Sequence, residues 1–244
     1  MASSAKLQAK DREFVQIVQH ALEDATARSG EWLKCRPGCA QCCHGVFAIN
    51  QLDAERLRLG LAELARSDPD RARRILSRAE DAVERLSAEF PGDVASGRLA
   101  EDDASVAAFE HFANHEPCPV LDPLHGTCDL YAWRPMTCRI FGPPVRSEDG
   151  LGVCELCFVG ASVSTIEACE LKLPPPEIEQ QLNEAAERET GAQGSTIIAF
   201  ALTRPSLGTL AHPTMSDGAA PFAAESSAAS RISNPRSAKM SGKD

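Results

Sequence analysis

Hydrophobic positions near the start of the chain recur at the spacing of an α-helix. Between Ala5 and Arg28 the apolar side chains fall on one broad stripe and charged side chains lie opposite. The stripe consists of Phe14, Val15, Ile17, Val18, Ala21 and Leu22. Because Gly30 interrupts the pattern, residues 1–30 are predicted to form an N-terminal amphipathic helix.

Helical periodicity returns after the first quarter of the chain. Residues 50–66 and 67–90 each begin with polar side chains suited to capping a helix, and the second pattern stops at Pro91-Gly92. A further helix is predicted over residues 97–115. Before these helices, residues 46–49 form a short apolar run that favours a strand or an extended segment.

The second half of the chain gives weaker patterns. Residues 117–152 are dense in proline and glycine, which predicts loops ordered by something other than a large core. Residues 174–202 begin with three prolines and read as a helix followed by a short apolar segment, with a last strand over 195–202. Residues 203–244 are mostly small or polar, which is typical of a disordered tail.

These patterns predict a mainly α fold, with helices around a loop-rich cysteine-cluster metal centre and a disordered C-terminal tail. The expected organisation is an N-terminal amphipathic helix over 1–30, a cysteine-cluster metal-binding domain over 31–173, a C-terminal helix and apolar segment over 174–202, and the tail over 203–244.

Composition narrows the classes of function. The chain has 244 residues, of which 43% are hydrophobic, enough for one domain with a core. Its net charge of −10 argues against nucleic acid or an anionic membrane surface as a partner. The first twenty residues lack the apolar run of a secretory signal, and no stretch is long and apolar enough to span a bilayer. A cytoplasmic location is therefore expected.

Ten cysteines carry the chemical signal. Four of them fall within nine residues, at Cys35, Cys39, Cys42 and Cys43, where Pro37-Gly38 supplies a turn that could aim successive sulfurs at one point. In a reducing compartment clustered thiols are more often metal ligands than disulfides. Cys169 stands alone and reads as a core residue. The candidate ligands are Cys35, Cys39, Cys42, Cys43, Cys118, Cys128, Cys138, Cys154 and Cys157.

Thiolates suit zinc or iron, including a 4Fe–4S cluster, and the spacing does not choose between them. The C-x3-C-x2-C spacing of the first three cysteines is also that of radical S-adenosylmethionine enzymes, but the chain offers few of the strands that such a barrel needs. A zinc ribbon would pair Cys39 and Cys42 with Cys154 and Cys157. Because the number of cysteines is even, a structure in which all of them pair in disulfides is a further alternative.

Basic and aromatic residues accompany the cysteines. Arg134 and Arg139 flank Cys138, and Arg36 follows Cys35, so their guanidinium groups could offset the negative charge of thiolates. The alternative is that they are solvated or pair with acidic neighbours. Two further expectations concern other side chains. Tyr131, Trp133 and Phe141 are expected to pack around the site, and His44, His111, His115 and His125 are weaker ligand candidates.

Three blocks of the chain resemble a known family. The cysteine cluster is followed by Cys118–Asp122, Gly126–Tyr131 and Arg134–Arg139, and together these closely resemble the bacterial CxxCxxCC cysteine-cluster family, the YkgJ-like zinc- or iron-chelating domain. The resemblance covers roughly residues 31–145. The family usually has two residues between its first two cysteines, whereas this chain has three.

The resemblance implies metal chelation and names no reaction. Some members are flagellin lysine methylases, much longer than this chain. Three classes of function therefore stand: a metal-binding protein chelating zinc or iron, an iron–sulfur redox or methyl-transfer enzyme, and an adaptor protein whose metal is structural. The expected partners are a metal ion or cluster and an unidentified protein. The sequence leaves open whether the chain is an enzyme, because it shows no hydrolase, kinase or dehydrogenase motif.

Overall fold

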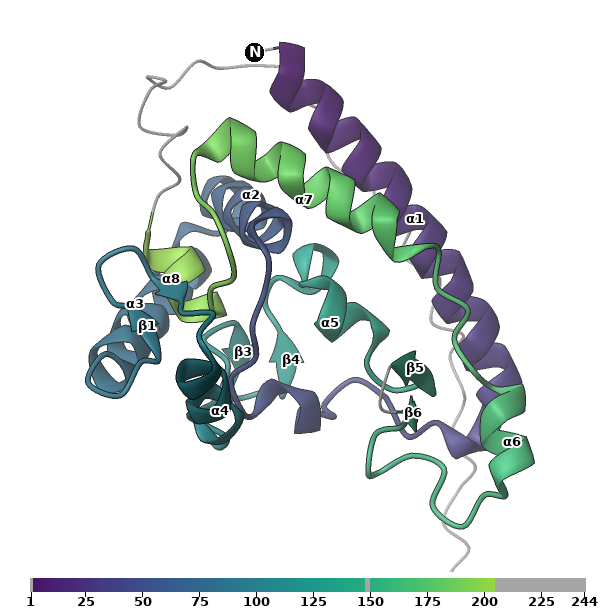
Figure 1. The fold of residues 1–244 in the computed structure, drawn as a ribbon. Coiled ribbons are helices and arrows are strands. Elements are labelled where there is room, and N and C mark those ends of the chain that lie inside the picture. The colour runs from purple at the N-terminus through teal and green to yellow at the C-terminus, as the bar shows by residue number, and fades with distance from the viewer. Residues whose placement is uncertain (1, 148–149, 205–244) are drawn as a thin grey trace, which may run out of the picture. The chain divides into compact units, whose positions relative to one another are not determined.

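Helices provide most of the regular structure of this chain (Figure 1). The computed structural model describes residues 2–147 and 150–204, which all belong to one unit, Met1–His212. The predicted mainly α fold is confirmed for this part of the chain. The predicted tail, 203–244, lies outside the described residues except for Thr203 and Arg204. The α-helices are α1 (Ala2–Ser29), α2 (Gln51–Ser67), α3 (Pro69–Leu86), α4 (Asp103–His111), α5 (Met136–Ile140), α6 (Val163–Ala168), α7 (Pro176–Thr190) and α8 (Ile198–Thr203).

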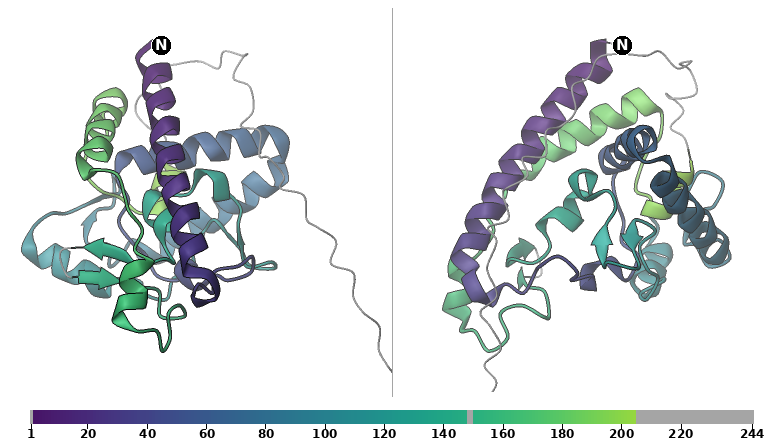
Figure 2. Two further views of the ribbon diagram at one scale, coloured as in Figure 1. Left: turned by 90° about the vertical axis from the view of Figure 1, so that its right-hand side faces the viewer. Right: turned by 180° about the vertical axis from the view of Figure 1, so that it is seen from behind.

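The long helices α1 and α7 lie side by side in all three views (Figures 1 and 2). The stripe predicted for α1 is largely confirmed, because Phe14 and Val18 are buried against Leu182 and Ala186 of α7. Ile17, which the periodicity also placed on the stripe, is 45% exposed. No helix among the described residues is long and apolar enough to cross a membrane.

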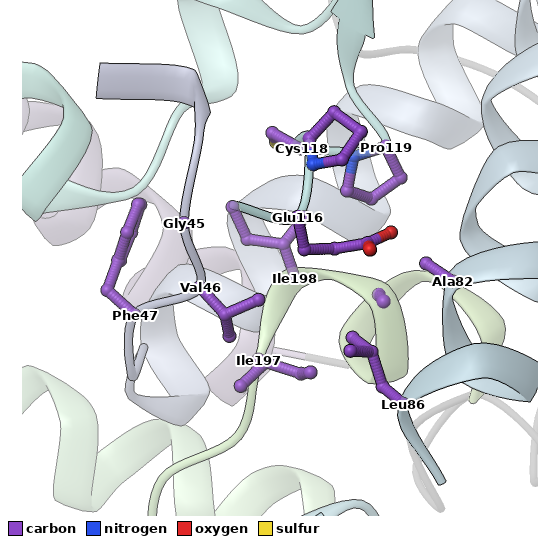
Figure 3. A pocket seen from close by; sticks show the side chains of 12 residues that line it. Gly45, Val46, Phe47, Ala82, Leu86, Glu116, Cys118, Pro119, Ile197 and Ile198 are labelled. Atoms are coloured by element: carbon purple, nitrogen blue, oxygen red, sulfur yellow. The ribbon is translucent and has the colours of Figure 1, made fainter. Parts of the chain in front are cut away.

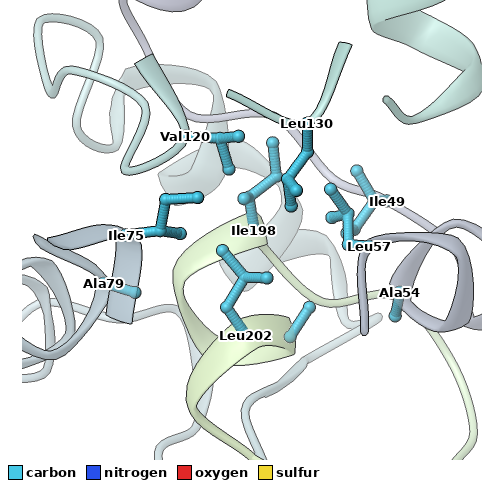
Figure 4. Packing of buried hydrophobic residues seen from close by; sticks show 10 residues of the cluster. Ile49, Ala54, Leu57, Ile75, Ala79, Val120, Leu130, Ile198 and Leu202 are labelled. Carbon is cyan, nitrogen blue, oxygen red and sulfur yellow. The ribbon is translucent and has the colours of Figure 1, made fainter. Parts of the chain in front are cut away.

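A second layer of packing joins α2, α3 and α8 (Figure 4). Asn50 caps α2 by accepting a hydrogen bond from the amide of Asp53, and Asp68 caps α3 in the same way. Leu57 and Ile75 bury their side chains in the core between these helices. Each such side chain contributes about 1.5–3 kcal/mol relative to an exposed one.

The loop-rich region contributes more to this core than its composition suggests. Val120 and Leu130 are almost fully buried and pack with the α2–α3–α8 side chains. Residues 117–152 also contain regular structure. This consists of β3 (Leu121–Asp122) paired with β4 (Thr127–Cys128), the 3-10 turn η3 (Tyr131–Trp133), α5, and β5 (Val145–Ser147) paired with β6 (Gly150–Gly152). The expectation that little side-chain packing orders this region is wrong.

Two other predicted elements differ from the structure. The helix expected over 97–115 is only α4, because β1 (Gly92–Asp93) and β2 (Arg98–Leu99) form a hairpin first and Asp102 then caps the helix. The strand expected over 195–202 is mostly α8. A single β-bridge, between Ile49 and Thr196, is all that the described residues retain of it. Short apolar runs of this length occur both in buried helices and in buried strands, so the hydrophobic pattern alone does not distinguish the two.

A buried charge network fixes the start of α5 relative to α1 and α2. Arg56 of α2 binds Asp11 of α1, with Nη2 2.5 Å from Oδ1, and also pairs with Asp53 of its own helix. Asp53 Oδ1 accepts a hydrogen bond of 2.9 Å from the amide of Met136, the first residue of α5. Burial raises the pKa of Asp53, and the Arg56 guanidinium opposes that rise.

We expect Arg56→Met to lower the free energy of unfolding by about 3–5 kcal/mol, because Asp53 and Asp11 would stay buried without their counter-charge. The matched control is Arg73→Met, which removes an exposed i,i+3 pair with Asp70 and should change stability by less than about 0.5 kcal/mol. Chemical denaturation measures both. Equal small losses would show that the buried network contributes little.

Candidate metal centre

Five cysteines from separate segments gather beside the α2–α3–α8 core. They lie in the 3-10 turn η2 (Gln41–Cys43), just before β3, in β4 and in α5. The amide of Cys118 donates to the carbonyl of Cys43 at 2.8 Å, which holds two of these segments together. The sulfur of Cys138 has three of the other thiols as electrostatic neighbours. We call this set the five-thiol group: Cys42, Cys43, Cys118, Cys128 and Cys138.

Four other cysteines form a second set, the four-thiol group: Cys35, Cys39, Cys154 and Cys157. The Cys35 thiol interacts with all three of its companions. The amide of Lys34 donates to the sulfur of Cys157 at 3.3 Å, and the amide of Phe158 donates to the carbonyl of Trp32 at 3.0 Å. These bonds bring the segment after α1 (including the 3-10 turn η1, Gly30–Trp32) against the loop after β6.

The structure divides the nine-residue cysteine cluster between the two groups. One turn closes where the Cys39 amide donates to the Arg36 carbonyl, at 2.9 Å, with Gly38 at a φ of 90°. The next closes where the Cys43 amide donates to the Ala40 carbonyl, also at 2.9 Å. Two successive turns therefore aim Cys39 and Cys42 at different partners. A zinc ribbon with both in one shell does not match this arrangement.

Local backbone prepares several of these sulfurs for negative charge. At Cys118, Cys128 and Cys154 the backbone amide two residues later in the chain interacts with the sulfur and lowers its pKa, which stabilises the thiolate. The amide of Cys157 also donates to the carbonyl of Cys154 at 2.8 Å, which closes the C-x2-C turn. Hydrogen bonds to sulfur are a recurring feature of thiolate-bound metals.

Burial disfavours the charged form of most of the thiols. It raises the pKa of Cys118 to about 12 and also raises the pKa values of Cys128 and Cys138. The adjacent pair Cys42 and Cys43 behaves differently, because a hydrogen bond from Cys43 lowers the pKa of Cys42 to about 6 and raises that of Cys43. The pair therefore gives up its first proton easily and its second with difficulty.

Cys35 of the four-thiol group is exposed at the surface, but partial desolvation of its sulfur and the neighbouring Cys157 raise its pKa to about 12. Gly142 lets the chain pass close to this sulfur. Its φ is 128°, and a Cβ added there would lie 2.9 Å from Cys35 Sγ. A larger residue at this position would push the Cys35 side chain away from its companions.

Two buried arginines, Arg134 and Arg139, lie in this region, and Arg134 borders the five-thiol group. Arg134 interacts electrostatically with Cys42 and Cys128 and stacks on the Tyr131 ring, 3.8 Å from its centroid. Burial and the Arg134 charge lower the pKa of Arg139 to about 10. Within the described part of the chain, Arg139 Nε is buried without a hydrogen-bond partner.

The acidic residues that could have neutralised these arginines have other partners. Asp129 pairs with Arg71 and Arg78, Asp122 binds His125, and Glu155 accepts from Gln41. Arg134 and Arg139 instead donate hydrogen bonds to backbone carbonyls of η3, those of Tyr131 and Ala132. The buried positive charge of Arg134 therefore lies next to the thiols of Cys42 and Cys128, and a thiolate would supply its missing negative charge.

A cavity of about 480 Å³ is lined by residues of both groups. Cys42 and Cys138 of the five-thiol group and Cys154 of the four-thiol group line it, together with His44 and Asn114. A second pocket, behind Cys118, has room for about one water at 30 Å³ and is walled by apolar side chains such as Val46 and Ile197 (Figure 3). The larger cavity is therefore the route by which an ion or small molecule can approach the thiols.

The remaining candidates fall outside both groups. His111 ends α4 and His115 lies beyond it, so they do not share a helix face, and both are exposed. His125 is bound to Asp122. Cys169 is buried near Cys154 and Cys157, but its thiol donates to the carbonyl of Arg28.

The donor set fits a thiolate-bound metal in its chemistry. Soft sulfur ligands, amides that interact with them and the buried Arg134 cation are the surroundings that such a site needs. Among the described residues, however, no three His, Cys, Asp or Glu side chains are placed to hold one ion as they stand. Binding therefore requires cysteine side chains to change rotamer, a motion between staggered wells.

The chain belongs to the CxxCxxCC family, whose description is "putative zinc- or iron-chelating domain". The family model matches residues 34–157, which is about half of the chain and contains both cysteine groups. No curated protein and no solved structure matches the chain. The resemblance noted from the sequence is thus confirmed at the level of the family.

We expect Arg134→Gln to weaken zinc binding by about 10- to 100-fold, because the buried guanidinium beside Cys42 and Cys128 would no longer offset thiolate charge. Competition with a chromophoric chelator measures the affinity, and circular dichroism checks that the variant folds. Arg73→Gln, on the exposed face of α3, is the control. If the two variants bind zinc with equal affinity, the Arg134 charge does not contribute to zinc binding.

Proposed function

We propose that the chain chelates zinc or iron through cysteine thiolates contributed by both groups. The ligands are drawn from Cys35, Cys39, Cys42, Cys43, Cys118, Cys128, Cys138, Cys154 and Cys157. The observation that carries this proposal is that nine of the ten cysteines, spread over more than a hundred residues, gather in two groups beside one cavity. Family membership supports the same function.

The surroundings of the thiols favour a bound metal over a reduced, metal-free role. The buried Arg134 gains its counter-charge when neighbouring thiols lose protons, and a bound metal would make several adjacent thiols do so together at neutral pH. When bound, the metal would supply Lewis acidity or, as an iron–sulfur cluster, an electron. The chain's own residues hold the thiolates and balance their charge.

We propose a reducing, cytoplasmic setting for this protein. All ten cysteines are free, including the adjacent Cys42 and Cys43. Thiols in such numbers persist where the compartment keeps them reduced. The proposal is tested by fractionating cells and trapping free thiols during lysis.

Changing Cys39, Cys42 or Cys138 to Ser should each lower the amount of bound metal substantially, because loss of a thiolate leaves an incomplete shell. Metal analysis of protein purified without oxygen measures its zinc and iron content. The colour and the labile-sulfide content of the same sample distinguish a colourless zinc protein from an iron–sulfur protein.

The matched control is Cys169→Ser, which removes a buried thiol that already donates to the Arg28 carbonyl. It should retain the full metal content. If the three other variants also retain it, the proposed function is wrong.

A further inference from the structure

We propose that this chain holds two separate metal centres, one in each cysteine group. This inference rests on the proposed function and goes beyond it, because the family description names a chelating domain without saying how many ions it holds or which thiols share one. The first centre is a closed shell of the four-thiol group. The second takes its ligands from the five-thiol group.

The sulfurs themselves support the division. The strongest thiol neighbours of Cys35 are Cys157, Cys39 and Cys154, all in the four-thiol group. Those of Cys138 are Cys118, Cys128 and Cys42, all in the five-thiol group. The backbone supports the same division, because the turn closed by the Cys39 amide and the turn closed by the Cys43 amide are separate, and the Cys118 amide ties the second turn to the five-thiol group through the Cys43 carbonyl.

The four-thiol group has the pattern of a closed structural site. It is built from a C-x3-C turn and a C-x2-C turn, which together supply the four ligands of a tetrahedral ion. Its amide partners, Lys34 to Cys157 and Leu156 to Cys154, are already in place. An ion here would join the segment after α1 to the segment before α6, which are linked by the bond from the Phe158 amide to the Trp32 carbonyl and by that from the Lys34 amide to the Cys157 sulfur.

The five-thiol group differs in charge and in the number of its thiols. Its Cys42 and Cys128 are bordered by the buried Arg134, whose positive charge offsets part of the net negative charge of a shell of thiolates. It also has one more thiol than a tetrahedral ion needs. Cys42 and Cys138 line the cavity on behalf of this group, as Cys154 does for the four-thiol group, so a ligand can approach either centre.

The test is a titration of the reduced, metal-free chain with Co²⁺, whose absorption reports thiolate coordination. We expect about two Co²⁺ per chain, one for each shell of four thiolates. Cys154→Ser/Cys157→Ser should bind about one, and so should Cys118→Ser/Cys128→Ser, because each double variant leaves the other group complete. One Co²⁺ per wild-type chain, lost in either double variant, would overturn the proposal.

A second measurement uses only the wild-type chain and so does not depend on the variants folding. One equivalent of Co²⁺ is added, exposed thiols are alkylated, and intact molecules carrying one ion are fragmented in a mass spectrometer. The unmodified cysteines should all belong to one group, with the buried Cys169 left out of the comparison. Unmodified cysteines from both groups in the same molecule would show a shared centre.

Failure of the proposed function gives a different result. A chain that chelates no metal would bind no Co²⁺ and would leave its reactive thiols alkylated whether or not the ion is present. A single shared centre, in contrast, would still protect thiols, but from both groups at once. The two failures are therefore distinguishable in one experiment.

Discussion

The position of the site depends on the contacts that one buried carboxylate, that of Asp53, makes with other elements. It pairs with Arg56, which also binds Asp11 of α1, and it accepts the hydrogen bond from the first amide of α5. The short helix α5 carries Cys138 and Arg139. Helix packing in the N-terminal half of the chain thus determines where a thiol and a buried charge of the second half are placed.

Charge is the second constraint, and it explains why the site and the fold are coupled. A buried guanidinium is costly without an anion, and Arg134 is buried beside Cys42 and Cys128. The pKa of Cys42 is lowered, whereas burial raises the pKa values of Cys118, Cys128 and Cys138 and so disfavours their anions. A bound metal ion would drive these remaining thiols to ionise, and their charge would then balance that of Arg134.

Sequence reasoning found the helices that showed an apolar stripe or a clear start or stop signal, namely α1, α2, α3 and α7. It overestimated α4 because Leu99 continues the apolar period while the chain there forms a hairpin, and it missed the core role of Val120 and Leu130 because single apolar residues among prolines and glycines show no period. Nine candidate cysteines could be named from spacing. Their division into groups could not, because it depends on backbone turns and on contacts between distant segments.

The cluster from Cys35 to Cys43 shows why close spacing misleads about shared sites. Short gaps between cysteines suggest one shell only if a single turn carries all the sulfurs. Here two turns follow each other. The Cys43 carbonyl, in the second turn, accepts a hydrogen bond from the Cys118 amide. The β3–β4 turn packs on the first, since a Cβ at Gly126 would lie 3.0 Å from the Gly38 carbonyl oxygen. Tertiary contacts on each turn therefore fix the direction of its sulfurs, and neighbours in sequence come to serve different partners.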